Sequence, residues 1–346
     1  MATQNFVFGW VEDIVAADHP TGGRIVRLDN AEEFHLPGDI VKASAFQAIF
    51  ENARDAGIPL LVTIDPERET ILTVDVPRPA DVVTILNDAD PNRTEVSLTL
   101  SQTRYFLSRS NPDFGQFHEA LASSMANGTG VRVTSTDSGE VIDVRATERP
   151  FIEAGEGAVE VGPLALTPVS MADAKSLFTM VAGLSCDPRN PSGSCITFLY
   201  PDDGCYARAH EMCRLIGGAK SGKVWNYGTL VAKTKNNPVC QVEWGYHVAS
   251  TISVKEAGTT SSYVIDPSMF GGPVTVAQWK AAQGDGNSRT VETDAAPYYR
   301  PEKGAAQFDL DYKSTKETLA NFRLQLKQRS SSPSGPPPYA KCAALI

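Results

Sequence analysis

The sequence of 346 residues predicts an α+β protein in which two small β-α-β-β repeats precede a larger domain with reactive side chains. A chain of this length exceeds the usual size of one hydrophobic core, so we expect several packed units. The first half of the chain resembles itself at an interval of 71 positions. In the second half, a cysteine, a histidine and an aspartate occupy the start of a predicted helix, a predicted strand and the end of the next strand.

The repeat consists of a strand, a helix and two further strands, in that order. A shift of 71 positions aligns Phe34 with Tyr105 and Gly57 with Gly128 without a gap. Apolar side chains spaced as on one helix face precede Gly57, and glycine suits the left-handed residue that ends a helix. Two β-branched runs then flank a turn at residues 65–68. We therefore predict one repeat over residues 1–77 and a second over 78–150.

The later boundaries follow from changes in composition. Residues 151–168 contain proline and glycine with little periodicity, which predicts a linker open to proteolysis. Ser170 and Asp173 then precede an apolar helical pattern, so a helix with a capped start opens the next domain, 169–328. Residues 329–346 are rich in serine and proline and are predicted to form a flexible tail.

Composition excludes some partners and suggests a cellular compartment. The net charge of −10 and the pI near 5.1 disfavour nucleic acid, which requires clustered Lys and Arg. We find neither an apolar run long enough to span a membrane nor a leader at the start of the chain. Five of the six cysteines lie between Cys186 and Cys240, which favours an oxidised, secreted protein, trimmed of its leader or delivered as an effector. We expect a monomer.

Cys205 has the setting of a reactive thiol. It follows the turn sequence PDDG and precedes YARAHEMCRLIGG, whose composition and closing glycines predict a helix. The positive end of a helix dipole lowers the pKa of a thiol, and the thiolate is the nucleophile. Cys205 is therefore the candidate nucleophile.

His247 and Asp266 supply the matching base and orienting group. In QVEWGYHVAS, Val242, Trp244, Tyr246 and Val248 alternate with smaller or polar residues, so we place His247 on the less bulky face of a strand. Asp266 precedes a proline, which ends the following strand. A nucleophile, a base 42 residues later and a carboxylate 19 residues beyond it form the papain-like order of a catalytic triad.

Two other motifs predict nothing further. His210-Glu211 resembles the start of a zinc helix, but Arg214 stands where the second histidine would be needed. The glycine-rich residues 217–223 follow a helix and lack the ending of a phosphate loop. We expect neither a metal nor a cofactor.

Three blocks, CITFLYPDDGCYARAHEM, WGYHVA and VIDPSMFGGPVT, resemble the bacterial protein-glutaminase family over about residues 170 to 300. The resemblance implies a papain-like fold related to transglutaminases, with Cys205 as nucleophile, His247 as base and Asp266 as its partner. It also implies a disulfide between Cys186 and Cys195. Cys213, Cys240 and Cys342 have no assigned partners, and we expect at least one of them to stay free.

The second repeat, from EVSLTLSQTRYFLS onward, is similar to the pro-region of that family. Members are made as precursors in which this region covers the active site until it is cleaved. The first repeat resembles an added copy. We therefore expect residues 1 to about 165 to occlude the site, and the connector to be the processing site.

The resemblance implies hydrolysis of glutamine side chains in proteins to glutamate and ammonia through a cysteine thioester. Four aromatic residues near the triad are candidates for the walls of the substrate slot, although each also fits a core position: Trp225, Tyr227, Trp244 and Tyr246. Transglutaminase-like acyl transfer and peptide-bond cleavage remain alternatives. A non-catalytic binding protein built on the repeats, or a delivered effector toxin, is the alternative from another class.

Overall fold

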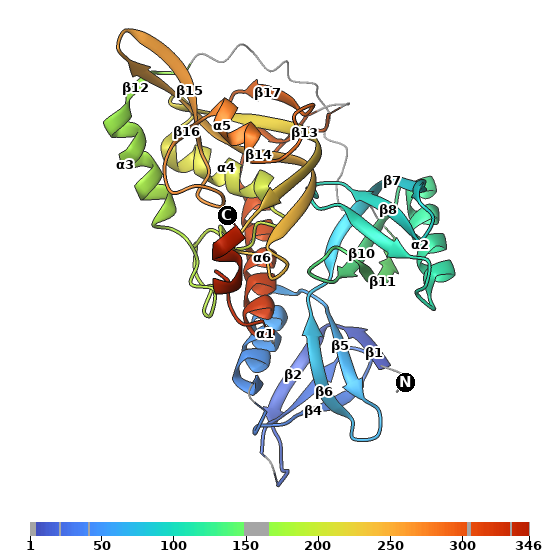
Figure 1. Cartoon of the computed structure of the whole chain (residues 1–346). Coiled ribbons are helices and arrows are strands. Elements are labelled where there is room, and N and C mark those ends of the chain that lie inside the picture. The colour runs from blue at the N-terminus through green and yellow to red at the C-terminus, as the bar shows by residue number, and fades with distance from the viewer. Residues whose placement is uncertain are drawn as a thin grey trace.

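The computed structural model describes residues 5–20, 22–40, 42–148, 166–302, 306–332 and 334–345. These residues form a mixed α+β protein with several separate β-sheets, which confirms the predicted class. Figure 1 shows three bodies, with the two N-terminal units beside and below the larger C-terminal one. The predicted linker lies outside the described residues, apart from its last three positions.

The first unit has six strands and one helix. Its sheet has the strand order β1-β5-β6-β4-β3-β2. Helix α1 buries Phe46, Ile49, Phe50 and Ala53 against this sheet, and it ends at Gly57, whose φ of 63° lies in the left-handed region. The elements are β1 (Asn5–Gly9), β2 (Val11–Ala16), β3 (Arg24–Leu28), β4 (Glu33–Leu36), α1 (Ala43–Ala56), β5 (Leu60–Asp65) and β6 (Thr70–Asp75).

The second unit has the same order of elements. Its helix has the same 14-residue length as α1, and Gly128 ends it with the same φ of 63° as Gly57. Long strand β7 pairs with β10 at its start and with β8 further on, so it takes the place of β1 and β2 together. The elements are β7 (Arg78–Asp90), β8 (Arg93–Leu98), β9 (Tyr105–Ser108), α2 (Phe114–Asn127), β10 (Gly130–Ser135) and β11 (Val141–Ala146).

Each unit is thus larger than the β-α-β-β set expected from the sequence. The strand, helix and two strands of that set correspond to β4, α1, β5 and β6 in the first unit. Strands β1 to β3, or β7 and β8, precede the set and pair into the same sheet. They bury the second half of each core, including Val26 and Leu28 in one unit and Val96 and Leu98 in the other.

The third unit is built on the sheet β16-β15-β14-β13-β17, with β12 parallel to β14. Helix α4 packs on this sheet, and its residues share a core with Trp225, Tyr246 and Val248. Its elements up to β15 are β12 (Val169–Ser170), α3 (Met171–Ala182), α4 (Cys205–Ile216), β13 (Ser221–Lys233), β14 (Gln241–Glu256) and β15 (Thr259–Ile265). The remainder are β16 (Val274–Thr275), α5 (Val276–Ala281), β17 (Arg289–Thr293), β18 (Pro297–Tyr299), β19 (Gln307–Phe308), α6 (Lys313–Ser330) and the 3₁₀ helix η1 (Ala340–Leu345).

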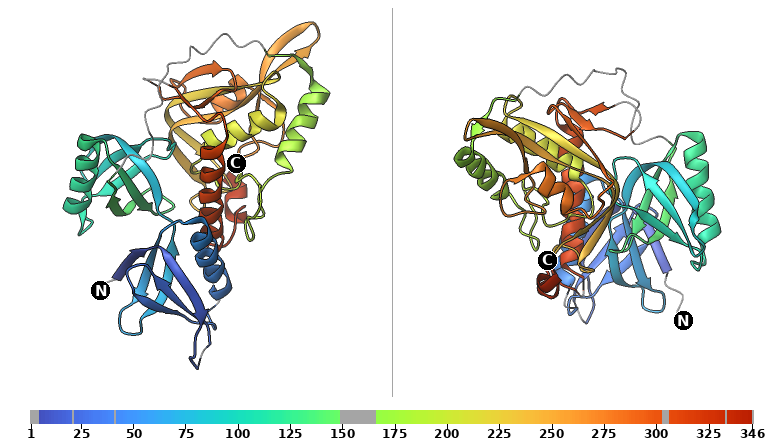
Figure 2. Two further views of the ribbon diagram at one scale, coloured as in Figure 1. Left: turned by 180° about the vertical axis from the view of Figure 1, so that it is seen from behind. Right: turned by 45° about the horizontal axis from the view of Figure 1, so that its top comes forward.

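The C-terminal segment is not the flexible tail that its composition predicted. A disulfide joins Cys342 to Cys240, and both Cys342 and Tyr339 are buried. The covalent tie and this burial offset the entropy that a serine- and proline-rich segment would otherwise keep. Helix α6 runs beside α1 in every view (Figures 1 and 2), and its Leu324 belongs to the core of the first unit.

Within the described residues, none of the helices combines the length and the apolar character needed to cross a membrane.

Candidate active site

Cys205 is the first residue of the 12-residue helix α4. The preceding Gly204 has a φ of 80°, and a Cβ there would lie 2.6 Å from the ring of Phe322. Only glycine fits this turn without strain. The Asp203 carboxylate accepts the Gly204 amide at 2.7 Å, which fixes the turn that places Cys205 at the positive end of the helix.

His247 and Asp266 lie together. Strands β14 and β15 pair antiparallel, with Ser250 opposite Ile265, the last residue of β15. Asp266 follows Ile265 and therefore lies level with the middle of β14. The Nε2 atom of His247 lies 2.8 Å from Asp266 Oδ2. The indole N–H of Trp279 also donates to Oδ2, at 2.9 Å, and Ser268 donates its hydroxyl to Oδ1.

The Asp266 carboxylate is held in its charged form. Burial alone would raise its pKa, but the charge and hydrogen bond of His247, together with the hydrogen bonds of Ser268 and Trp279, lower the pKa to about 2. The imidazole ring is also stacked between Trp244, with ring centroids 4.4 Å apart, and Trp279, at 5.4 Å. These contacts fix the plane of the ring and leave Nδ1 as the nitrogen available for chemistry.

The placement of Trp244 corrects the strand alternation predicted from the sequence. Trp244 was expected on the face opposite His247, yet the two rings stack. The pairing between β13 and β14 shifts register between Tyr227 and Leu230, beside Gly245, and this irregularity breaks the period of two. Tyr246 and Val248 do face the core that contains Cys205.

Cys205 is 1% exposed and lies in the same buried cluster as Tyr246 and Val248, the two neighbours of His247 in the strand. The backbone of Val248 hydrogen-bonds the Cys205 sulfur, so the thiol lies beside β14 next to the position of His247. Burial raises the pKa of the Cys205 thiol well above its usual value, and the nearby charge of Arg208 opposes this only in part. In this state the sulfur is held as a thiol.

A segment of the second unit contributes to this burial. Thr103 forms an antiparallel β-bridge with Trp244 of β14: the Gly245 amide donates to the Gln102 carbonyl at 2.8 Å, and the Arg104 amide donates to the Glu243 carbonyl at 3.2 Å. The Gln102 side chain is fully buried, with Oε1 3.4 Å from His247 Nδ1. Its Nε2 donates to the carbonyl of Pro201, just ahead of the turn before Cys205.

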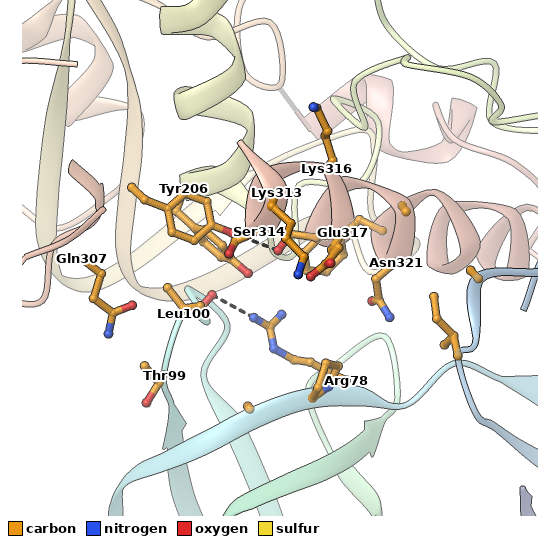
Figure 3. A pocket seen from close by; sticks show the side chains of 18 of the residues that line it. Arg78, Thr99, Leu100, Tyr206, Gln307, Lys313, Ser314, Lys316, Glu317 and Asn321 are labelled. Carbon is orange, nitrogen blue, oxygen red and sulfur yellow. Dashed lines mark hydrogen bonds between the residues drawn. The ribbon is translucent and has the colours of Figure 1, made fainter. Parts of the chain in front are cut away.

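Two buried arginines stabilise the contact between the second and third units through ion pairs. Arg78 of β7 pairs with Asp203, which also accepts the hydroxyl of Ser101. Figure 3 shows the Arg78 guanidinium directed at the Leu100 carbonyl, at 2.8 Å, beside a cavity of about 1130 Å³. On the other side, Arg329 of α6 pairs with Asp202 and with Asp137 of the second unit.

Several other residues singled out in the sequence form disulfides or hydrogen bonds in the structure. The structure contains the Cys186–Cys195 disulfide, and Cys240 pairs with Cys342, which leaves Cys205 and Cys213 free. His210 contacts the Asp309 carbonyl and Lys223. Trp225 donates to Thr293, and Tyr227 to the Arg300 carbonyl, so both are buried core residues here. Among the described residues, no group of His, Cys, Asp and Glu side chains could hold a metal.

Three residues of the site were missed by the sequence reasoning. Ser268 follows Asp266 by two positions, which is a typical spacing for a hydrogen bond between a turn aspartate and a serine. This contact could therefore have been predicted from the sequence. Trp279 lies on short helix α5, 13 residues beyond its carboxylate partner. Gln102 is 145 residues from His247, and only the fold brings them together.

Comparison with known proteins identifies the family of the chain. A family model described as Glutaminase matches residues 174–283. A crystal structure of pro-protein-glutaminase is 28% identical, over 77% of this chain and 97% of that one, with a TM-score of 0.54. A mutant pro-protein-glutaminase is also 28% identical, over 77% and 98%, with a TM-score of 0.51.

The NMR structure of protein-glutaminase from Chryseobacterium proteolyticum is 36% identical, over 52% of this chain and 98% of that one, with a TM-score of 0.42. No curated protein matches the chain. The similarity to the pro-forms extends over both N-terminal and C-terminal parts, and it confirms the resemblance seen in the sequence motifs. The chain belongs to the protein-glutaminase precursor family.

Proposed function

We propose that this protein hydrolyses the side-chain amide of glutamine residues in proteins, with Cys205, His247 and Asp266 as a catalytic triad on a papain-like, transglutaminase-like domain. The observation that carries the proposal is the buried pair of His247 and Asp266, 2.8 Å apart, beside a cysteine at a helix start. Membership of the protein-glutaminase precursor family selects glutamine as the substrate.

The chemistry follows from the positions of the three groups. His247 takes the thiol proton through Nδ1, and the sulfur attacks the amide carbon of the substrate. Collapse of the tetrahedral intermediate expels ammonia, which carries the proton that His247 returns. Water then attacks the thioester by the reverse sequence and releases glutamate. The Cys205 amide, at the start of α4, is placed to donate to the oxyanion, while Asp266 stabilises the imidazolium.

The N-terminal units would hold the enzyme inactive. Residues 101–104 occupy the edge of β14 next to His247, and Cys205 is 1% exposed. A protein substrate has to reach the same edge, so the second unit excludes it. Cleavage in the connector would then allow the cover to dissociate, and the raised pKa of the Cys205 thiol would fall once water reaches it.

The disulfides fit a secreted precursor. Cys186–Cys195 and Cys240–Cys342 would not persist in a reducing cytosol. Trp244 and Tyr246 lie at the covered edge, with Trp244 bridged to Thr103, and we keep them as candidate walls of the glutamine slot. Trp225 and Tyr227 lie deeper, on β13, and would support that wall from behind.

The test is ammonia release from casein by the intact chain, by the chain cut between residues 149 and 165, and by cut Cys205→Ala. We expect release from the cut chain alone. Crosslinked casein would instead indicate acyl transfer to lysine, and new peptide ends would indicate a protease. If cut and uncut chains are equally silent although the cover has been removed, the proposal is wrong and a binding role is the better account.

A further inference from the structure

The segment that covers the site carries a glutamine in the place where a substrate glutamine would have to lie. Ser101 and Thr103, on either side of Gln102, are fixed by hydrogen bonds to Asp203 and to the Asp202 carbonyl. The backbone of Gln102 is bonded on one side to Gly245 and on the other to the Asp203 carboxylate. Gln102 is therefore held between the strand of His247 and the turn before Cys205.

The side chain of Gln102 lies between His247 and the turn that precedes Cys205. It is fully buried, its Oε1 lies 3.4 Å from His247 Nδ1, and its Nε2 donates to the Pro201 carbonyl. Nδ1 is the nitrogen left free once Asp266 has taken Nε2. Gln283 is a second glutamine that is equally buried, but its side chain bonds to Asn226 and to the Trp279 carbonyl and so serves as a comparison for Gln102.

We propose that Gln102 is the first substrate of this enzyme: Cys205 deamidates it within the same chain, and the resulting glutamate loosens the cover. The inference rests on the proposed function of the triad. On this proposal, Gln102 is a modification site of the precursor, and the N-terminal region is both an inhibitor and a substrate that reacts once.

The reaction balances with groups at the site and water. The sulfur of Cys205 bonds to Cδ of Gln102, the C–N bond breaks, and Nε2 leaves as ammonia with the proton that His247 supplies. Water then cleaves the thioester, which restores the thiol and leaves a glutamate side chain at position 102. No oxidant or further reactant is required.

The resting geometry keeps this reaction slow. The departing nitrogen must face His247, whereas Nε2 now faces Pro201, so the amide has to make a half-turn about its last single bond. Burial also keeps the Cys205 sulfur protonated. The cavity of about 1130 Å³ lies nearby in the sequence, because Leu100 and Tyr206 line it, but neither Gln102 nor Cys205 does (Figure 3).

The product disturbs the contacts that the amide satisfies. A carboxylate at position 102 has no N–H for the Pro201 carbonyl, so two acceptors face each other. The new negative charge also lies near the Asp203 carboxylate, which already accepts the backbone amide of the same residue. Both changes favour separation of residues 101–104 from β14.

The test follows Gln102 itself by peptide mass spectrometry of the intact chain. The wild-type chain and Cys205→Ala are incubated side by side in ¹⁸O water and digested. We expect the peptide with Gln102 to acquire a solvent oxygen in place of its amide nitrogen, or to appear as a thioester with the Cys205 peptide. Neither change is expected in Cys205→Ala, and the Gln283 peptide should stay unchanged in both chains.

Unmodified Gln102 in the wild-type chain would overturn the inference, provided that the same preparation, once cut, deamidates casein. If the cut chain leaves casein unchanged too, the proposed function fails instead. Release of the cover is tested separately with Gln102→Glu and the similarly sized, unreactive Gln102→Met. The uncut Gln102→Glu chain should release ammonia from casein about tenfold faster than Gln102→Met, and equal rates would refute the loosening step.

Discussion

Replacing Arg78 by methionine should open the covered site without touching the catalytic domain. Arg78 belongs to β7 of the second unit, and its guanidinium pairs with Asp203, two residues before Cys205. It also donates to the Leu100 carbonyl at 2.8 Å. Both members of the ion pair are buried, with 6% and 2% of their surfaces exposed. Methionine keeps much of the side-chain length but provides neither charge nor donor.

The size of the effect follows from the fate of Asp203. Removal of one partner from a buried ion pair costs about 3–5 kcal/mol, because the other charge stays buried and uncompensated. Asp203 keeps hydrogen bonds from Ser101 and Gly204, so the lower end, about 3 kcal/mol, applies here. Once the cover separates, Asp203 is hydrated and the penalty disappears. The open fraction of the uncut chain should therefore rise about a hundredfold.

The assay is ammonia release from casein by the uncut chain, where the wild type gives the background. Uncut Arg78→Met should exceed that background by up to about a hundredfold. After cleavage and removal of the N-terminal units, variant and wild type should be equal. Arg93→Met is the matched control, because Arg93 pairs with Asp90 inside the second unit and is half exposed. An uncut Arg78→Met chain as silent as wild type, although folded, would refute the reasoning.

Three further changes have defined outcomes. Asp266→Asn, which leaves His247 without its carboxylate, should lower kcat of the cut enzyme by about 10²–10⁴ with little change in KM, and unchanged kcat would exclude Asp266 from the triad. Burial raises the pKa of Asp75 to about 6, with a smaller contribution from the charge of a second carboxylate, so the folded state binds its proton more tightly than the unfolded chain does. The stability gained by protonation of Asp75 is complete below pH 3.8 and is lost as the pH rises to about 6. In urea titrations, Asp75→Asn should remove this pH dependence of the free energy of unfolding. It should also stabilise the chain at pH 7 by on the order of 2 kcal/mol. The Cys240–Cys342 disulfide closes a separation of 102 residues, and its loss in the double serine variant should lower the free energy of unfolding by about 4 kcal/mol, while an unchanged urea midpoint would show that the C-terminal segment holds without it.

The local settings of the three candidate catalytic residues were readable in the sequence, because each depends on neighbours within a few positions. The PDDG turn and the helix behind Cys205, and the proline after Asp266, act through the adjacent backbone. The position of Trp244 was not readable, since it depends on a register shift in the neighbouring strand. Alternation predicts faces only while both strands stay regular.

The flexible C-terminal tail predicted from composition was wrong for a different reason. A run of serine and proline predicts disorder when nothing else holds it, but here Cys342 and buried Arg329 tie it to the third unit. Cysteine pairing cannot be read from spacing when the partners are 102 residues apart. The extra strands of each repeat were missed because the alignment that revealed the repeat begins at Phe34 and Tyr105, after β1 to β3 in one copy and after β7 and β8 in the other.

The two repeats have different contacts and therefore different roles in the precursor. Arg78 and residues 101–104, all from the second unit, make the contacts beside Cys205 and His247. The first unit contacts the C-terminal helix, where Leu324 enters its core and Gln328 donates to Asp75 at 2.7 Å, while the second unit reaches the same helix through Asp137 and Arg329. Trp10 of the first unit also lies under Arg132 of the second unit. On the proposed function, the added copy does not plug the site; because it contacts both the second unit and α6, it helps to hold the second unit against the third.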